Sequence, residues 1–263
     1  MSATQARSQV VSSFTIIKGA LIDETFAAFE KWDFSQSKKD NLRVMQEHNT
    51  IGAQSTNWLR DVRKVLNRRF DPGGRDRPLV ELAKARCDRA VWTPLLLWHM
   101  TRDEFLVRDF MINWLYPRYV EGTYRLEPDD VVPYLTALRG KQEIGLSSEW
   151  TVTTTERVAS GLLRIAADFG FLKGAAVKEF ASYHLPDDSF VYLLQAFAQS
   201  EPNARRIVES LDWRLYLMDS EDVERELLRL HQFRRLGYEA AGSLARLDLP
   251  ASSLSGYARD LVT

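Results

Sequence analysis

The chain has 263 residues, of which 45% are hydrophobic and 27% charged, and this balance excludes a disordered protein. The length is sufficient for one large helical body or for two smaller domains with a full core. The only cysteine, Cys87, cannot form an internal disulfide, and a formal net charge of −1 excludes a uniformly basic or acidic protein.

Apolar residues recur at helical spacing along most of the chain, and strict alternation is almost absent, so the sequence predicts a compact, multi-helix, all-α globular protein. In chain order, the predicted helices are Leu21–Lys31, Lys38–His48, Ser55–Phe70, Arg77–Arg89, Arg102–Tyr119, Asp129–Arg139, Thr154–Phe169, Ala175–Tyr183, Asp188–Gln199, Pro202–Ser210 and Ser220–Leu236.

The N-terminal residues contain no apolar run long enough for a signal peptide. The most apolar segment, Val91–Met100, is followed at once by Thr-Arg-Asp-Glu, whereas a membrane span needs about 20 apolar residues. We therefore predict a buried helix at this segment and a cytoplasmic protein that does not span a membrane.

Two segments predict breaks between structural units. Asp71–Pro78 holds two prolines and two adjacent glycines, which stop a helix, and Glu121–Asp130 is the second break. We predict an N-terminal helical unit over residues 1–75, a central aromatic-rich helical layer over 76–125, a second unit over 126–200 and an acidic helical tail over 201–263.

Charge is distributed unevenly along the chain. Ser35–Arg69 carries eight basic residues against three acids, a balance of +5, whereas Glu201–Leu230 carries eight acids against five arginines, a balance of −3. A basic patch lets a nearly neutral protein attract a polyanion. Solvated helix faces have the same appearance, so charge alone does not identify a binding site.

The first candidate for nucleic-acid binding is the helix Ser55–Phe70, which follows a helix ending at His48 and a short turn with Gly52. Ser55 is the predicted N-cap. The predicted apolar stripe consists of Trp58, Leu59, Val62, Val65, Leu66 and Phe70. The predicted DNA-binding residues are Asn57 in the first turn and the basic residues Arg60, Arg63, Lys64 and Arg68. The pattern is typical of a helix-turn-helix, and also of an amphipathic surface helix.

The second candidate is the helix Thr154–Phe169. Thr153 and Glu156 predict a capping box at its start, and Gly170 predicts its end. A hairpin after this helix would resemble the wing that follows the recognition helix of a winged helix. The predicted ligand-facing residues are Arg157, Arg164 and Lys173.

Motifs of catalysis are absent from the sequence. It contains no P-loop, dinucleotide fingerprint, nucleophile elbow or His-Glu-x-x-His string. The four histidines are far apart and lack partners at metal-ligand spacing, and no acid is followed two residues later by lysine. We expect no enzyme, no metal and no cofactor, although a nuclease that uses carboxylates alone is left open.

Many positions together resemble the BrxA family, whose members are core components of BREX bacteriophage-exclusion systems. The resemblance covers roughly residues 14–195 and is carried by Phe14-Thr15, Gly19, Glu24-Thr25, Asp40-Asn41, Ser55–Phe70, Ser148, Trp150, Thr153–Thr155, Arg157, Leu162-Leu163 and Asp168-Phe169-Gly170. It implies an all-α protein with two helix-turn-helix elements that binds double-stranded DNA and has no known catalytic activity. The family has also been described as RNA-binding and as an inner-membrane protein.

We therefore expect a monomeric, non-enzymatic protein that binds double-stranded DNA and works with other BREX subunits. A helical adaptor that assembles larger subunits is the alternative, because the acidic tail and the aromatic centre suit protein contacts. RNA binding through the same basic patch is a third hypothesis.

Overall fold

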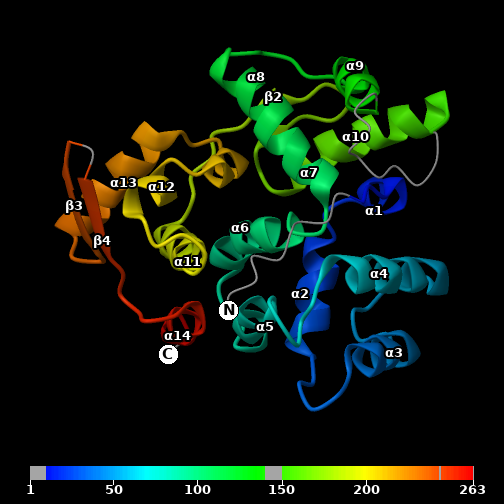
Figure 1. Ribbon diagram of the computed structural model, residues 1–263. Coiled ribbons are helices and arrows are strands. Elements are labelled where there is room, and N and C mark those ends of the chain that lie inside the picture. The colour runs from blue at the N-terminus through cyan, green and yellow to red at the C-terminus, as the bar shows by residue number, and fades with distance from the viewer. Residues whose placement is uncertain (1–9, 140–149, 243, 263) are drawn as a thin grey trace.

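The computed structural model describes residues 10–139, 150–242 and 244–262, which form a mostly helical body (Figure 1). Ser148, one of the residues that carry the family resemblance, lies outside these ranges. The N-terminal part contains α1 (Ser13–Lys18), α2 (Ile22–Glu30), α3 (Lys38–His48), α4 (Thr56–Arg69), α5 (Arg77–Lys84) and α6 (Arg89–Met100). The predicted bounds of α3 are confirmed, and those of α2 and α4 differ by one residue at each end.

Helix α5 is shorter than predicted. It ends at Lys84 because Arg86 adopts a left-handed backbone conformation, with φ of 57°, which reverses the direction of the chain. Asp88 then caps the next helix, since its carboxylate accepts a hydrogen bond from the Ala90 amide at 2.8 Å. The predicted helix Arg77–Arg89 was therefore wrong in its second half.

Two apolar helices form the centre of the molecule. Helix α6 packs against α11 (Asp187–Ala198), and Figure 1 places both between the N-terminal helices and the C-terminal ones. Leu95, Leu96 and Leu97 of α6 are inaccessible to solvent, as are Leu193 and Leu194 of α11. The predicted buried helix over residues 91–100 is confirmed. In the part of the chain that the structure describes, no helix combines the length and apolarity needed to cross a bilayer.

The predicted helix Arg102–Tyr119 consists of α7 (Phe105–Phe110), a π-helical segment (Met111–Leu115) and α8 (Tyr116–Val120) in direct succession. Pro117 directly follows this segment, and in a regular α-helix its ring would clash with the carbonyl of Asn113, which favours the wider π-helical turn. The Tyr116 amide donates instead to the carbonyl of Met111, five residues back.

The second candidate unit contains α9 (Pro128–Arg139), α10 (Val152–Asp168), β1 (Leu172–Lys173) and β2 (Glu179–Phe180). The strands pair antiparallel, and an isolated bridge joins Leu126 to Lys178. The hairpin is confirmed, but the predicted helix Ala175–Tyr183 is wrong. Gly174, with φ of 100°, makes a tight turn there, and a Cβ at that position would lie 2.3 Å from the Val177 carbonyl oxygen.

The cap of α10 also differs from the prediction. Thr151, rather than Thr153, is the N-cap, and its hydroxyl accepts a hydrogen bond from the Thr154 amide at 3.2 Å. Gly170 ends the helix as predicted, with φ of 84°.

The C-terminal part is less helical than predicted. It contains α12 (Ala204–Val208), a 3₁₀-helix η2 (Leu211–Tyr216), α13 (Ser220–Gln232), β3 (Gly237–Ala241), β4 (Leu244–Asp248) and α14 (Leu254–Asp260). The antiparallel β3–β4 hairpin docks on α13 through buried Tyr238, whose hydroxyl donates to Glu224 at 2.9 Å. Helix α14 returns to pack on α5 and α11. The described residues are therefore mostly helical, as predicted, but they also contain two small antiparallel sheets that the all-α prediction did not include.

Candidate nucleic-acid interface

The first candidate surface is the exposed face of α4. Ser55 caps the helix as predicted, since its hydroxyl accepts a hydrogen bond from the Trp58 amide at 3.2 Å. Leu59, Val62, Val65 and Leu66 are buried, and Trp58 is only half-buried, with its indole nitrogen donating to Glu24. The apolar stripe is therefore confirmed, except that Trp58 lies at its edge.

Only part of the predicted basic row of α4 faces solvent freely. Arg60 and Lys64 are exposed, and Arg60 donates to the side-chain oxygen of exposed Asn57 at 3.1 Å. Arg63 instead donates to Gln46 of α3 at 3.1 Å. Arg68 donates to the Val10 carbonyl at 2.6 Å and lies 3.6 Å from buried Glu104. Arg63 and Arg68 thus take part in packing the fold.

Arg69, which the sequence reading did not single out, is completely buried. Its guanidinium donates to the carbonyls of Thr15, Gly19 and Ala20 at 2.8–3.0 Å and to the Glu104 carboxylate at 3.2 Å. The three hydrogen bonds from Arg69 to these carbonyls hold the end of α1 against α4. The burial of Arg69 could have been predicted from the sequence, because it follows Val65 and Leu66 at helical spacing and so lies on the same apolar stripe.

The second candidate surface is α10 with the β1–β2 hairpin. Arg157 and Lys173 are exposed and form no ion pair within the described residues. Arg164 is also exposed, but it donates to the Ile17 carbonyl of α1 at 2.5 Å. The face is not purely basic, because Glu156 and Asp168 are also exposed on it.

Helix α1 joins the two candidate surfaces. Gly161 of α10 lies against Ile16, and the Asp168 carboxylate accepts a hydrogen bond from the Ala20 amide at 3.2 Å, so α1 runs along α10. On its other side, Lys18 pairs with Asp61 of α4 at 2.7 Å. Figure 1 shows α1 between α10 and α4. The structure therefore brings together two segments about 100 residues apart in the sequence.

Around α1, an exposed ring and several cations share one surface. The Phe14 ring lies 5.4 Å from the Lys18 ammonium and 5.7 Å from the Lys64 ammonium, within the range of cation–π attraction. Lys18 is a basic residue of this surface that helical periodicity did not reveal, because α1 spans only six residues. With Arg60 and Lys64 of α4 and Arg157 of α10, it gives cations from three elements that meet at α1.

The close contact between α1 and α10 is testable at Gly161. A Cβ there would lie 2.9 Å from the Ile16 carbonyl oxygen, so α1 must shift to admit even a methyl group. We expect Gly161→Ala to destabilise the fold by about 1 kcal/mol in urea unfolding, despite the intrinsic helix preference for alanine. The neighbouring exposed Ser160→Ala should leave the midpoint unchanged or raise it. A stabilised Gly161→Ala variant would contradict this contact.

His99 and Cys87, two chemically suggestive groups away from this surface, are buried. His99 lies between Asp76, 2.6 Å from Nδ1, and Tyr192, 2.9 Å from Nε2, and all three side chains are inaccessible to solvent. Burial raises the pKa of the Cys87 thiol to about 11. These groups lie within the packed core of the described residues. Among the described residues, no group of three His, Cys, Asp or Glu side chains is placed to hold a metal ion.

A protein-family model described as BrxA matches residues 13–196, which is more than half of the chain and includes α1, α4, α10 and the β1–β2 hairpin. No curated protein matches the chain.

Proposed function

Since the chain belongs to the BrxA family, we propose that it is a monomeric, cytoplasmic, non-enzymatic component of a BREX phage-defence system that binds double-stranded DNA. Family membership implies a role in BREX defence and suggests other BREX subunits as partners. DNA binding is our proposal, and the observation that carries it is the set of exposed cations Arg60 and Lys64 of α4 and Arg157 of α10, two helices that α1 joins.

The first helix pair supports contacts to phosphates rather than to bases. The connection between α3 and α4 runs over residues 49–55, which is longer than the three or four residues typical of a DNA-binding helix-turn-helix. The exposed cations of α4 are long side chains suited to phosphates, which carry no sequence information. We therefore propose that α4 neutralises the DNA backbone.

The second unit supports a winged-helix mode. Along the chain, Leu126 precedes α9, α10 and the β1–β2 hairpin. It pairs with Lys178 in an isolated antiparallel bridge, next to the hairpin strand β2. In this proposal the exposed face of α10, with Arg157, approaches the groove, and the hairpin with Lys173 contacts the adjacent backbone.

The test is a binding titration with fluorescent duplex DNA at two or more salt concentrations. We expect little sequence preference and a steep loss of affinity with salt, because phosphate neutralisation releases counterions. Arg60→Ala and Lys64→Ala should each weaken binding and reduce the salt slope by about one unit. Arg206→Ala, an exposed arginine of α12 in the acidic segment, is the matched control and should bind like the parent.

Parallel titrations with duplex RNA and single-stranded DNA separate the nucleic-acid hypotheses. Weaker binding to both would support the proposal, and tighter binding to RNA would contradict it. Salt-independent binding, or no binding at low salt, would also contradict it. If Arg157→Ala and Lys173→Ala weaken binding while the α4 variants do not, α10 and the hairpin alone carry the contact.

A further inference from the structure

The Phe14 ring is exposed on the surface around α1. Helix α1 lies between α4 and α10 (Figure 1), so a duplex that contacts the exposed cations of both helices passes over α1. Phe14 is 36% exposed, whereas its neighbours Thr15 and Ile16 are buried. When DNA arrives, an apolar ring at this position loses its water and comes to face a phosphate, a sugar or a base.

The backbone around Phe14 is held in place on both sides of the ring. The Ser12 hydroxyl accepts a hydrogen bond from the Thr15 amide at 3.4 Å, and buried Arg69 donates to the Thr15 carbonyl at 2.8 Å. Ile16 packs against α10. Because the position of the ring is fixed before DNA arrives, a contact through the ring requires little ordering of the protein.

The cations beside the ring favour a base as its contact. The Lys18 and Lys64 ammonium groups lie 5.4 and 5.7 Å from the ring centre. Asp61 pairs with Lys18, whereas Lys64 is exposed. These ammonium groups attract phosphates to positions beside the ring, and phosphates gain nothing from the apolar ring itself. Aromatic faces stack on bases of any sequence.

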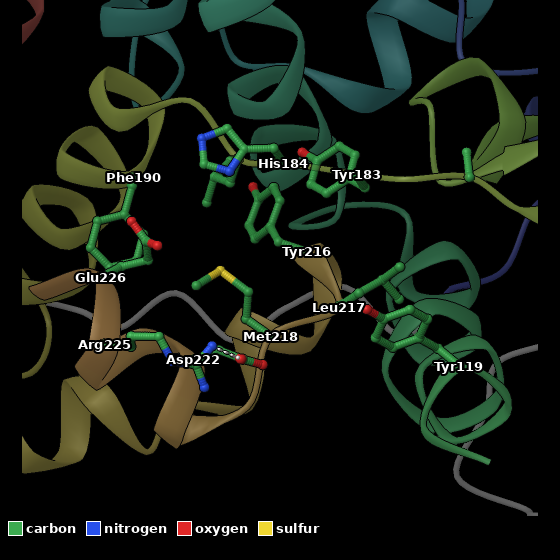
Figure 2. Close-up of a pocket in the computed structure, with 12 residues that line it drawn as sticks. Tyr119, Tyr183, His184, Phe190, Tyr216, Leu217, Met218, Asp222, Arg225 and Glu226 are labelled. Atoms are coloured by element: carbon green, nitrogen blue, oxygen red, sulfur yellow. Dashed lines mark hydrogen bonds and ion pairs between the residues drawn. The ribbon is translucent and has the colours of Figure 1, made fainter. Parts of the chain in front are cut away.

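Rings also gather at a cavity of about 230 Å³ beside α13, where Figure 2 shows Tyr183, Tyr216 and Phe190. Tyr216 and Phe190 are only 1% and 2% exposed, so a base cannot stack on their faces. The cavity also adjoins the segment Glu201–Leu230, whose charge balance of −3 disfavours phosphates. The exposed ring on α1, with lysines beside it, is therefore the better contact for DNA.

We propose that Phe14 inserts into a base step of the bound duplex and stacks on a base. This inference rests on the proposed DNA binding and adds a contact that does not involve phosphate. Apolar wedges of this kind unstack a base step and kink the duplex. Opening a step costs least where a base is already unpaired. The chain should therefore prefer a duplex that contains an unpaired base to a fully paired duplex.

The test is a titration of the full chain with two fluorescent duplexes that differ by one unpaired adenine at the centre. At the same salt concentration, we expect the duplex with the unpaired adenine to bind about fivefold more tightly. Phe14→Ala should remove this preference and weaken binding to the paired duplex several-fold. Its salt slope should equal that of the parent, because the ring releases no counterions, whereas Lys64→Ala should reduce the slope.

Two further variants complete the comparison. Phe14→Trp keeps an aromatic face and should retain the preference for the unpaired adenine. Phe233→Ala removes a ring that is 68% exposed at the end of α13, and this matched control should bind both duplexes like the parent. Thermal melts check that each variant is folded.

The outcomes separate this inference from the proposed function. Steeply salt-dependent duplex binding without a preference for the unpaired adenine would overturn this inference alone. A preference that Phe14→Ala retains, or that Phe233→Ala also loses, would have the same meaning. If the parent binds no duplex at low salt, the proposed function fails and this inference fails with it.

Discussion

Replacing Arg69 by methionine is expected to destabilise the fold by about 3–5 kcal/mol, because it removes one partner of a buried charged network. The change leaves the carbonyls of Thr15, Gly19 and Ala20 without their shared donor. Among the described residues, it also leaves Glu104, 1% exposed, with Arg68 at 3.6 Å as its one remaining ion-pair partner. Methionine has an unbranched side chain that occupies much of the same space. The loss of unfolding free energy therefore measures the missing hydrogen bonds and charge more than a new cavity.

Urea unfolding followed by circular dichroism measures this effect. Arg60→Met is the matched control, since it removes an arginine from the exposed face of the same helix. We expect the control to change the unfolding free energy by less than about 0.5 kcal/mol. Equal midpoints for the two variants would contradict the structural role of Arg69. Because Arg69 holds the end of α1, its loss should also weaken the proposed DNA binding.

Acidification is expected to reduce stability by about 3 kcal/mol between pH 6.5 and pH 4, because of His99. Burial and the nearby charge of Arg102 lower the pKa of His99 from 6.5 to about 4, although its hydrogen bond to Asp76 acts in the opposite direction. Between these two values the unfolded chain binds a proton that the folded chain does not bind. Lowering the pH through this range therefore favours unfolding, and the full contribution of His99 is present above pH 6.5.

The partner carboxylate extends the effect to lower pH. Burial alone would raise the pKa of Asp76, but the hydrogen bond from His99 and the charge of Arg102 keep it below its usual value. The stability that Asp76 contributes is present above pH 3.8 and is lost as the pH falls below that value.

Unfolding free energies at half-unit pH steps check the prediction, with His99→Asn as the comparison. Asparagine can keep a donor near Asp76 but has no proton to gain, so the variant should be less stable at pH 7 and lose most of the slope between pH 6.5 and 4. A parent curve without that slope would contradict the neutral, buried state of His99.

Local signals predicted most of the N-terminal helices because caps and periodicity act within one helix. Ser37 and Ser55 cap α3 and α4 through their own hydroxyls, and the burial of Val62, Val65 and Leu66 follows from 3.6-residue spacing. The helix predicted over residues 175–183 was wrong because the conformation there depends on the pairing of Lys178 with Leu126, a residue about 50 positions away in the sequence.

The candidate interface was predicted in part for the same reason. Asn57, Arg60 and Lys64 are exposed as expected, whereas Arg68 and Arg164 are engaged by carbonyls of Val10 and Ile17, which no periodicity places near them. The contacts of α1 with both α4 and α10 arise from the tertiary fold, so local sequence patterns do not predict them. Whether these residues contact DNA stays a prediction.

The two oppositely charged segments described above lie at opposite ends of the folded molecule, and their separation contributes an electric dipole. Ser35–Arg69, with its balance of +5, forms α3 and α4 at one end of Figure 1, and Glu201–Leu230, with −3, forms α12 and α13 at the other. In the field of a polyanion such a molecule experiences a torque before any contact, so that the α3–α4 end leads the approach. A molecule that meets the polyanion in this orientation has its acidic end, α12 and α13, directed toward solvent. Salt that shortens the screening length below about 10 Å would abolish this torque. The protein would then meet the polyanion in random orientations.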